Sequence, residues 1–193
     1  MNADGLVLAG GRSRRFGSDK RKAMLGGRSL LAICCQRVGG AVGAGVYVAA
    51  PRRAELPALP ATVAFVADEC PGAGPLAGIT AALDRSRRAG VVVLACDLPM
   101  VRSSTLVRIA ALGIANRRVV AVRGRAGWEP LLAFYPRTAL QQLRSGLREG
   151  PRALHSWLDK LGALALVDIA AEELTNMNRA SDLDRVSKRA KGF

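Results

Sequence analysis

The architecture is indicated most strongly by the segment Leu6-Val7-Leu8-Ala9-Gly10-Gly11-Arg12-Ser13-Arg14-Arg15-Phe16-Gly17-Ser18-Asp19-Lys20. Its first three residues are apolar and predict a short β-strand. The two adjacent glycines at the end of that strand allow the backbone to turn sharply and to approach a ligand closely. The loop then offers backbone N–H donors, hydroxyls and cations, a combination that suits a polyphosphate.

The spacing of the glycines excludes two common nucleotide-binding loops. The segment contains neither the Gly-x-x-x-x-Gly-Lys-Ser/Thr pattern of a P-loop nor the Gly-x-Gly-x-x-Gly pattern of a dinucleotide-binding fold. The positions of Arg15, Gly17 and Lys20 after the glycine pair favour a different phosphate loop. A glycine-rich turn with a solvated basic face is the structural alternative.

Apolar runs alternate with helix-like segments along the rest of the chain, as expected of an α/β fold with a mostly parallel sheet. The predicted strands are Leu6–Ala9, Val46–Ala50, Val63–Val66, Val91–Ala95, Val119–Val122, Leu131–Phe134 and Leu164–Val167. The predicted helices are Ser29–Val38, Leu76–Ala89, Ser103–Leu112, Arg137–Leu147, Arg152–Leu161 and Ala180–Ala190.

The glycine-rich segment resembles the signature of nucleoside-triphosphate transferases, Leu-Ala-Gly-Gly-x-Ser-x-Arg-x-Gly-x-x-Lys, and most closely that of molybdenum cofactor guanylyltransferases. The resemblance implies a Rossmann-like, three-layer α/β/α fold of the nucleotide-diphospho-sugar transferase type. We expect one domain over residues 1–193 with a frayed tail over 187–193. The implied nucleotide-binding residues in this segment are Leu8, Ala9, Gly10, Gly11 and Lys20, with Arg15 and Lys20 catalytic.

A second motif, Ala95-Cys96-Asp97-Leu98-Pro99-Met100, follows a buried strand. An acidic residue there lies at the ligand-bearing edge of an open α/β sheet. A carboxylate facing a triphosphate needs a bridging cation, and Mg²⁺ is the natural one. The resemblance implies that Asp97 is catalytic, binds the metal and thereby the nucleotide. A turn or helix-cap aspartate is the alternative.

A third motif, Pro71-Gly72-Ala73-Gly74-Pro75-Leu76-Ala77-Gly78, precedes a predicted helix and resembles the stretch beside the nucleobase in this family. The resemblance implies that Gly74 and Gly78 contact the nucleotide and that Asp68 contributes to guanine binding. A carboxylate can accept hydrogen bonds from both N1–H and the 2-amino group of guanine. Asp68 and Glu69 could equally be surface acids.

Two further motifs resemble the acceptor side of the family. Glu129, in Trp128-Glu129-Pro130-Leu131, could contact the acceptor or cap a strand. Asn176 and Asn178 lie one residue apart on an extended segment and should therefore point the same way. Their amides suit a metal-bound water or an acceptor phosphate.

Three features depart from the family pattern or stand outside the motifs. The extra basic pair Arg21-Lys22 makes Lys22 an alternative to Lys20 as the phosphate lysine. Pro51 stands where the family often has an asparagine. His155, the single histidine, lies in a predicted helix that we expect to be far from the motifs.

The composition limits the remaining function classes. The net charge is +14, but the arginines are scattered and aromatic residues make up only 4% of the chain, which argues against a nucleic-acid-binding surface. No apolar run approaches the roughly 18 residues that span a bilayer, so we expect no membrane contact and a cytoplasmic location. Cys34, Cys35, Cys70 and Cys96 have no metal-site or disulfide spacing and are expected to be reduced thiols.

The resemblance therefore predicts an enzyme that transfers GMP from GTP to Mo-molybdopterin with Mg²⁺ and releases pyrophosphate. Molybdenum-insertion or molybdoenzyme-maturation proteins are further candidate partners. Transfer of CMP or another nucleotide, to molybdopterin or to a sugar or alcohol phosphate, is the alternative within the fold. A non-catalytic nucleotide- or nucleic-acid-binding protein is the alternative from another class.

Overall fold

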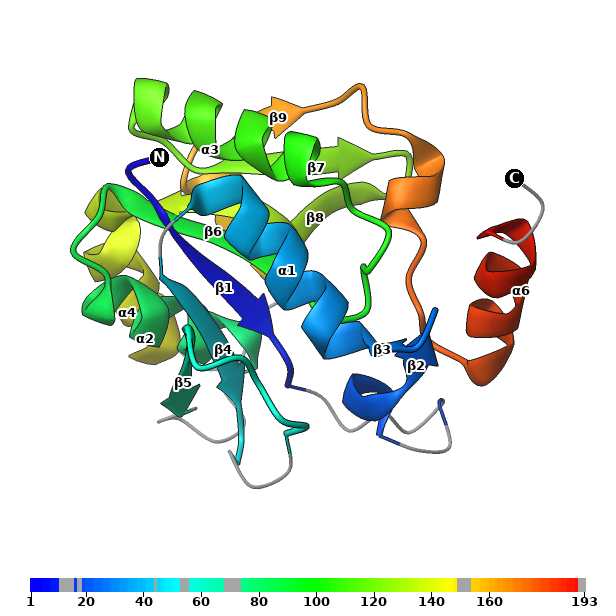
Figure 1. Cartoon of the computed structure of the whole chain (residues 1–193). Helices are drawn as coiled ribbons and strands as arrows, with labels where there is room; N and C mark the ends of the chain where they lie inside the picture. Colours follow the sequence, from blue (N-terminus) through cyan, green and yellow to red (C-terminus); the bar gives the residue numbers. More distant parts are fainter. Residues whose placement is uncertain are drawn as a thin grey trace.

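A seven-stranded sheet forms the centre of the chain in a computed structural model, which describes residues 1–10, 16, 19–43, 45–52, 56–67, 74–148 and 154–190, with side chains to 186 (Figure 1). The strand order is β5-β4-β1-β6-β8-β7-β9. The strands are β1 (Asp4–Leu8), β4 (Val46–Ala50), β5 (Val63–Ala67), β6 (Gly90–Ala95), β7 (Val120–Gly124), β8 (Gly127–Pro136) and β9 (Leu164–Leu166). All run parallel except β8, which is antiparallel to β6 and β7.

The order of the strands explains where a ligand can bind. Strand β1 lies between β4 and β6. The chain first adds β4 and β5 on one side of β1 and then adds β6 on its other side. This is a switch point, and ligands of open α/β sheets bind beyond the carboxyl ends of the strands at such points. The glycine pair and Asp97 follow two of those strands.

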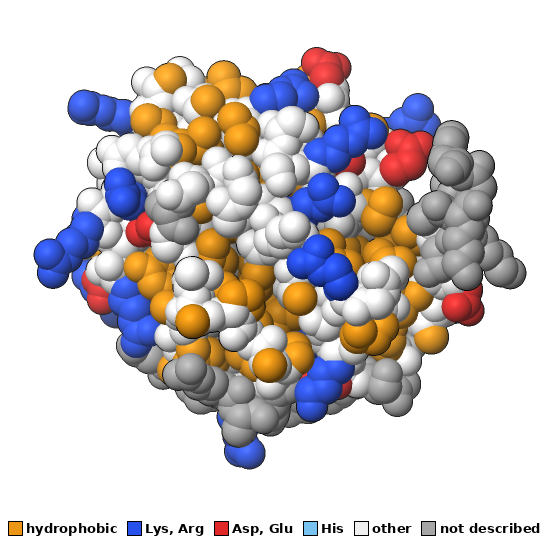
Figure 2. Space-filling model, in the orientation of Figure 1, with side chains coloured by type: hydrophobic (Ala, Val, Ile, Leu, Met, Phe, Trp, Pro, Cys, Tyr) orange, Lys and Arg blue, Asp and Glu red, His pale blue; other side chains and the backbone are white. Residues whose placement is uncertain are grey.

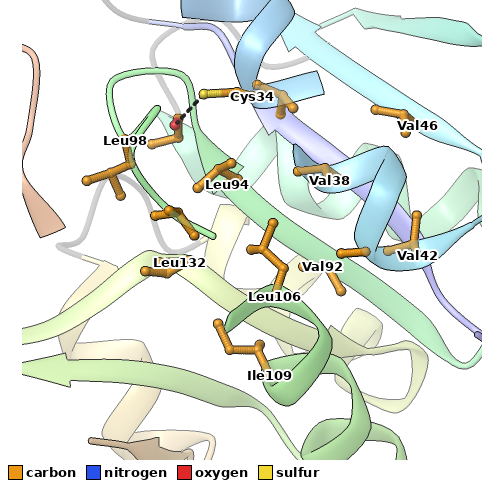
Figure 3. Packing of buried hydrophobic residues seen from close by; sticks show 14 of the residues in the cluster. Cys34, Val38, Val42, Val46, Val92, Leu94, Leu98, Leu106, Ile109 and Leu132 are labelled. Atoms are coloured by element: carbon orange, nitrogen blue, oxygen red, sulfur yellow. Dashed lines mark hydrogen bonds between the residues drawn. The ribbon is translucent and has the colours of Figure 1, made fainter. Parts of the chain in front are cut away.

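Helices cover both faces of the sheet. On one face α1 (Leu30–Val42) and α3 (Ser103–Asn116) lie in front of the strands in Figure 1. Their side chains, including Val38 and Leu106, pack on Val92 and Leu94 in one apolar cluster (Figure 3). On the other face α2 (Pro75–Arg85), α4 (Leu140–Arg148) and α5 (Leu154–Lys160) form a second cluster with the alternate strand residues. The predicted three-layer α/β/α architecture is confirmed.

Helix α1 is longer than the sequence predicted. Ser29 caps its start by accepting a hydrogen bond from the N–H of Ala32, and Gly43 ends it in the left-handed conformation. The predicted helix ended at Val38, before two glycines. It continues because Val42 in the last turn is only 1% exposed and packs in the core.

The remaining elements lie outside the main sheet. Strands β2 (Met24–Leu25) and β3 (Arg28–Ser29) form a small hairpin, with α6 (Ala180–Ala190) at the right of Figure 1. Helix α6 includes residues 187–190 of the segment for which we expected fraying, and 191–193 lie outside the described residues. In the described part of the chain, no helix combines the length and hydrophobicity needed to cross a bilayer.

The described cysteines are small core residues. Cys34, Cys35 and Cys96 are buried free thiols, and Cys70 lies outside the described residues. Burial raises the pKa of Cys35 and of Cys96 to about 12. The Cys34 thiol of α1 lies 3.7 Å from the carbonyl oxygens of Ala95 and Cys96, a weak contact to the turn before Asp97 (Figure 3). These thiols therefore act as packing groups.

Candidate active site

A cavity of about 290 Å³ lies beyond the carboxyl ends of β1, β4 and β6. Its walls combine apolar side chains from the strand ends with the start of α2, one cation and one carboxylate. The lining residues are Leu8, Gly10, Lys20, Ala49, Ala50, Pro51, Gly74, Pro75, Gly78, Ala95, Asp97 and Leu131. A largely apolar cleft with a few convergent polar groups is the common form of a small-molecule site.

The start of α2 forms one wall of the first cavity, and two glycines make this position possible. Gly74 precedes the helix at φ +68°, in the left-handed region that favours glycine, and Pro75 occupies the first helical turn. At Gly78, an added Cβ would stand 2.8 Å from Leu8 Cδ2 and 2.9 Å from Ala49 Cβ. Helix α2 can therefore lie directly against the strand ends that line the cavity.

We expect Gly78→Ala to destabilise the protein by about 1–3 kcal/mol, because the new methyl group overpacks the contact with Leu8 and Ala49. The displaced wall should also weaken nucleotide binding. Gly39→Ala is a matched control, since its Cβ meets only Val46 at 3.6 Å and helix α1 favours alanine over glycine. Chemical denaturation should show opposite signs for the two variants, and equal losses would contradict the packing argument.

Lys20 is positioned by a single helical turn, η1 (Lys20–Lys22). Asp19 caps the turn, accepting a hydrogen bond from the Arg21 N–H, and its carboxylate lies 2.7 Å from Arg21 Nε. The Arg21 contact lowers the pKa of Asp19. The three basic residues of this turn therefore have different surroundings. Arg21 binds Asp19, Lys22 is exposed, and Lys20 lines the cavity.

Lys20 and Asp97 form an ion pair across the cavity, with Nζ 2.8 Å from Oδ2. Both side chains are mostly buried, at 15% and 17% exposure. Burial lowers the pKa of Lys20, but the Asp97 carboxylate outweighs that effect, so the pKa is raised overall. Lys20 is therefore held as a cation in the first cavity, which Gly10 and Asp97 also line.

The Asp97 turn is fixed by backbone hydrogen bonds to two other segments. The Cys96 N–H donates to the Leu8 carbonyl, which joins this turn to the end of β1. The Asp97 carbonyl accepts from the Met177 N–H at 2.8 Å. This second bond brings Asn176 beside Asp97, although the two residues are far apart in the sequence.

A second cavity of about 250 Å³ lies on the other side of Asp97. It is lined by Pro75, Ala95, Asp97, Leu98, Glu129, Pro130, Leu131, Leu154, His155 and Asn176. It shares Pro75, Ala95, Asp97 and Leu131 with the first cavity, so the two are neighbours across the carboxylate. A ligand in the second cavity would lie next to one in the first.

An irregularity in β8 shapes this second cavity. Ala121 pairs with Ala133 but Val122 pairs with Glu129, so residues 130–132 leave the ladder with β7. Pro130 has no N–H to donate to that ladder. Its carbonyl instead accepts a hydrogen bond from the buried Tyr135 hydroxyl at 2.9 Å. The irregular segment places Leu131 between the two cavities and Glu129 at the far wall of the second.

Glu129 is half-buried among other charged groups. Burial raises the pKa of Glu129, while His155 opposes that shift and Asp97 adds to it. These effects arise because all three side chains face the second cavity.

A third cavity, of about 860 Å³, adjoins the second through Glu129 and Asn176. Its basic lining residues are Arg123 and Arg125. The guanidinium of Arg123 also lies 5.2 Å from the centre of the Trp128 ring. The three cavities form a continuous series from the end of β1 to the β7–β8 turn.

The structure brings most of the predicted site residues together. Leu8, Gly10, Lys20, Gly74, Gly78 and Asp97 line the first cavity, and Glu129 and Asn176 line the second. Ala9 is buried and donates its N–H to the Ala49 carbonyl. Asn178 is exposed like Asn176, with Met177 buried between them, and its N–H donates to Asp182. Gly11, Arg15 and Asp68 lie outside the described residues.

Sequence reasoning did not assign several lining residues to the site, and three of them shape the two cavities. His155, expected to be far from the motifs, lines the second cavity together with Asp97, which corrects that expectation. Pro51, noted only as a departure from the family, forms part of the first cavity wall. Leu131 lines both cavities through the irregularity in β8. For Leu131, the signal in the sequence was the neighbouring Pro130, directly before a predicted strand.

Three residues at the second cavity offer carboxylate or amide oxygens, the type of donor that a magnesium ion prefers. They are Asp97, Glu129 and Asn176. Within the described residues, no three His, Cys, Asp or Glu side chains cluster closely enough to enclose a metal. One protein carboxylate completed by substrate phosphates and water is a usual Mg²⁺ site, so Asp97 fits such an ion.

Comparison with known proteins agrees with this arrangement. A sequence model of the MobA-like NTP transferase domain matches residues 5–164. A protein of Opitutus terrae named "Probable molybdenum cofactor guanylyltransferase" is 37% identical over 190 residues, covering 94% of this chain and 93% of the relative.

Two solved structures share the fold. Molybdopterin-guanine dinucleotide biosynthesis protein A from Archaeoglobus fulgidus superimposes with a TM-score of 0.78 at 24% identity, over 98% of this chain and 100% of the other. A Mycobacterium tuberculosis protein, solved in complex with manganese, has a TM-score of 0.70 at 22% identity, over 96% and 98% of the two chains. With its glycine loop, its Asp97 turn and a relative of this identity and coverage, the chain belongs to the MobA-like NTP transferase family, together with the molybdenum cofactor guanylyltransferases.

Proposed function

We propose that this protein transfers GMP from GTP to the terminal phosphate of Mo-molybdopterin, giving molybdopterin guanine dinucleotide and pyrophosphate. The observation that carries the proposal is the pair of neighbouring cavities that share Asp97, the first beside Lys20 and the second beside Glu129. Two substrates bound in them would meet at Asp97. The name of the Opitutus terrae relative supports GTP and molybdopterin as those substrates.

The first cavity suits a nucleotide. Leu8, Ala49 and Pro51 offer an apolar wall, while Gly10 and Lys20 offer a close backbone approach and a cation. We propose that Leu8, Ala9, Gly10, Gly11, Gly74 and Gly78 surround the nucleoside and its phosphates. Lys20, with Arg15 from outside the described residues, would stabilise negative charge on the α-phosphate and the departing pyrophosphate.

The reaction needs no covalent intermediate with the protein. An oxygen of the acceptor phosphate forms a bond to the α-phosphorus, and the bond from that phosphorus to the bridging oxygen of pyrophosphate breaks. A phosphate is already a nucleophile at neutral pH, so no general base is required. Catalysis then consists mainly of orienting the two substrates and neutralising charge.

Asp97 is the proposed ligand of a divalent cation. We propose Mg²⁺, because the proposed ligand is a carboxylate oxygen, and the manganese complex of the Mycobacterium tuberculosis structure supports a divalent ion in this fold. When bound, such an ion neutralises charge on the phosphate oxygens. The Nζ atom of Lys20, 2.8 Å from Asp97 Oδ2, orients that carboxylate.

Base recognition is proposed to involve Asp68 and the backbone near Gly74. We expect GTP to bind at least tenfold more tightly than CTP, a difference of about 1.4 kcal/mol. A carboxylate that pairs with two guanine donors is left unpaired by cytosine, and a buried unpaired group is costly. Competition binding of the two nucleotides in the presence of Mg²⁺ measures this preference.

The variant Asp68→Asn tests the role of Asp68 in base recognition, and Glu69→Gln is its control. Asp68→Asn should shrink the preference, because an amide cannot accept hydrogen bonds from both donors, whereas Glu69→Gln should leave it unchanged. Equal affinities for GTP and CTP in the unmodified protein would defeat the guanylyl assignment and leave the transferase class standing.

The charge distribution favours a small anionic substrate over nucleic acid. Lys and Arg side chains are spread over the face in Figure 2, with other residues between them, and do not form one continuous patch there.

A cytoplasmic location belongs to the same proposal, because the described cysteines are free thiols.

A further inference from the structure

The second cavity presents an electrostatic problem for a phosphate-bearing acceptor. Two carboxylates, Asp97 and Glu129, face it. A phosphate monoester carries about 1.5 to 2 negative charges at pH 7 and would be repelled by both. Lys20 offsets the charge of Asp97, but it does not line this cavity, so a positively charged group that faces the cavity is needed to offset Glu129.

His155 is suited to that role by its position. Among the described residues that line the second cavity, His155 is the only one whose side chain can be a cation. The side chain lies near Glu129 and opposes the rise in the pKa of that carboxyl that burial causes. The side chain is exposed and accessible to a ligand.

The helix that carries His155 is fixed to the strand that carries Glu129. Asp159, one turn further along α5, accepts a hydrogen bond from Trp128 Nε1 at 2.9 Å. Residues four apart lie on the same face of a helix, so His155 and Asp159 both face β8. Leu154 and Trp157 are 6% exposed and anchor the helix in the core. The histidine is therefore held at the cavity.

We propose that His155 binds the phosphate of the acceptor and so selects acceptors that end in a phosphate monoester. This inference rests on the proposed function. His155 would act as a binding residue, because the acceptor phosphate needs no proton removed. Its imidazole donates hydrogen bonds to phosphate oxygens and offsets the repulsion from Asp97 and Glu129.

The test compares acceptor kinetics of the full chain at saturating GTP and Mg²⁺, with Mo-molybdopterin as the varied substrate. We expect His155→Ala to raise the acceptor KM at least fivefold, with kcat within twofold and GTP affinity unchanged. His155→Arg, which keeps a cationic donor, should restore the KM to within twofold. Lys160→Ala is the matched control, because it removes a cation from the same helix outside the cavity and should leave the KM unchanged.

Acceptor binding is titrated in parallel against the protein holding a GTP analogue that cannot be cleaved, which measures the His155 contact independently of turnover. A fivefold weaker acceptor affinity in His155→Ala, restored in His155→Arg, supports the inference. Unchanged acceptor affinity in His155→Ala, or a loss that His155→Arg does not restore, overturns it. Absence of turnover in the unmodified protein would instead contradict the proposed function.

Discussion

Lys20→Ala should lower kcat between roughly thirtyfold and a thousandfold, a loss of about 2–4 kcal/mol of transition-state stabilisation. The reason is the position of Lys20, whose ammonium lines the first cavity 2.8 Å from Asp97. Removing it takes away a charge-assisted contact to the phosphates and leaves Asp97 without this ion pair. The measurement is steady-state transfer by the purified variant, with circular dichroism to verify that it is folded.

Lys22→Ala is the control for Lys20→Ala. Lys22 belongs to the same helical turn and carries the same charge, but its side chain is exposed. Its replacement should change kcat less than twofold. An inactive Lys22→Ala together with an active Lys20→Ala would mean that Lys22 is the phosphate lysine.

Asp97→Ala should abolish the Mg²⁺-dependent reaction and make GTP binding indifferent to the metal. Asp97 is the carboxylate shared by the first and the second cavity, so the loss should reach at least about 3 kcal/mol, roughly a hundredfold. Isothermal titration of GTP with and without Mg²⁺ measures the change. Asp97→Asn distinguishes the effect of the negative charge from that of the side-chain shape, because the amide keeps an acceptor near Lys20 but loses the charge.

Asp84→Asn serves as the surface control for the aspartate variants. Its carboxylate pairs with Arg144 on the neighbouring helix and lines none of the three cavities. Metal dependence should persist in this variant. If GTP binding by Asp97→Ala still responds to Mg²⁺, the metal ligand lies elsewhere, and Asp68 becomes the next candidate.

The layers of the fold were predictable because buried parallel strands have a distinctive pattern. The run Val91-Val92-Val93-Leu94 is apolar throughout, and β6 is buried on both faces. Element ends were less predictable, since they depend on tertiary contacts. Helix α2 ends at Arg85, before the predicted Ala89, where Ser86 turns away and donates its hydroxyl hydrogen to the buried Asp4 carboxylate.

The first cavity was predictable because many of its lining residues follow strand ends in continuous motifs. Glycines and a lone aspartate beyond the carboxyl ends of parallel strands are typical of the ligand-binding edge of such a sheet. The acceptor side was harder, because it is assembled from segments far apart in the chain. His155 is held at the second cavity by the hydrogen bond between Trp128 and Asp159 and by the buried side chains of α5, and no local pattern encodes these tertiary contacts.

The spacing of the motif favoured Lys20 as the phosphate lysine and left Lys22, two residues further on, as the alternative. The structure adds that Lys20 lines the first cavity whereas Lys22 is exposed. The ion pair between Asp19 and Arg21 fixes the turn that presents Lys20 to the cavity. A hydrogen-bonded turn of three residues carries no periodicity that a sequence pattern could reveal.

The central claim is most directly tested by identifying the product. The purified protein is incubated with Mo-molybdopterin and Mg²⁺ and, in separate reactions, with GTP, CTP, ATP or UTP, and dinucleotide and pyrophosphate are quantified by mass spectrometry. We predict molybdopterin guanine dinucleotide and an equal amount of pyrophosphate from GTP, formed at least ten times faster than any product from CTP. Equal or faster formation of the cytosine dinucleotide, or no dinucleotide from any nucleotide, would contradict the account.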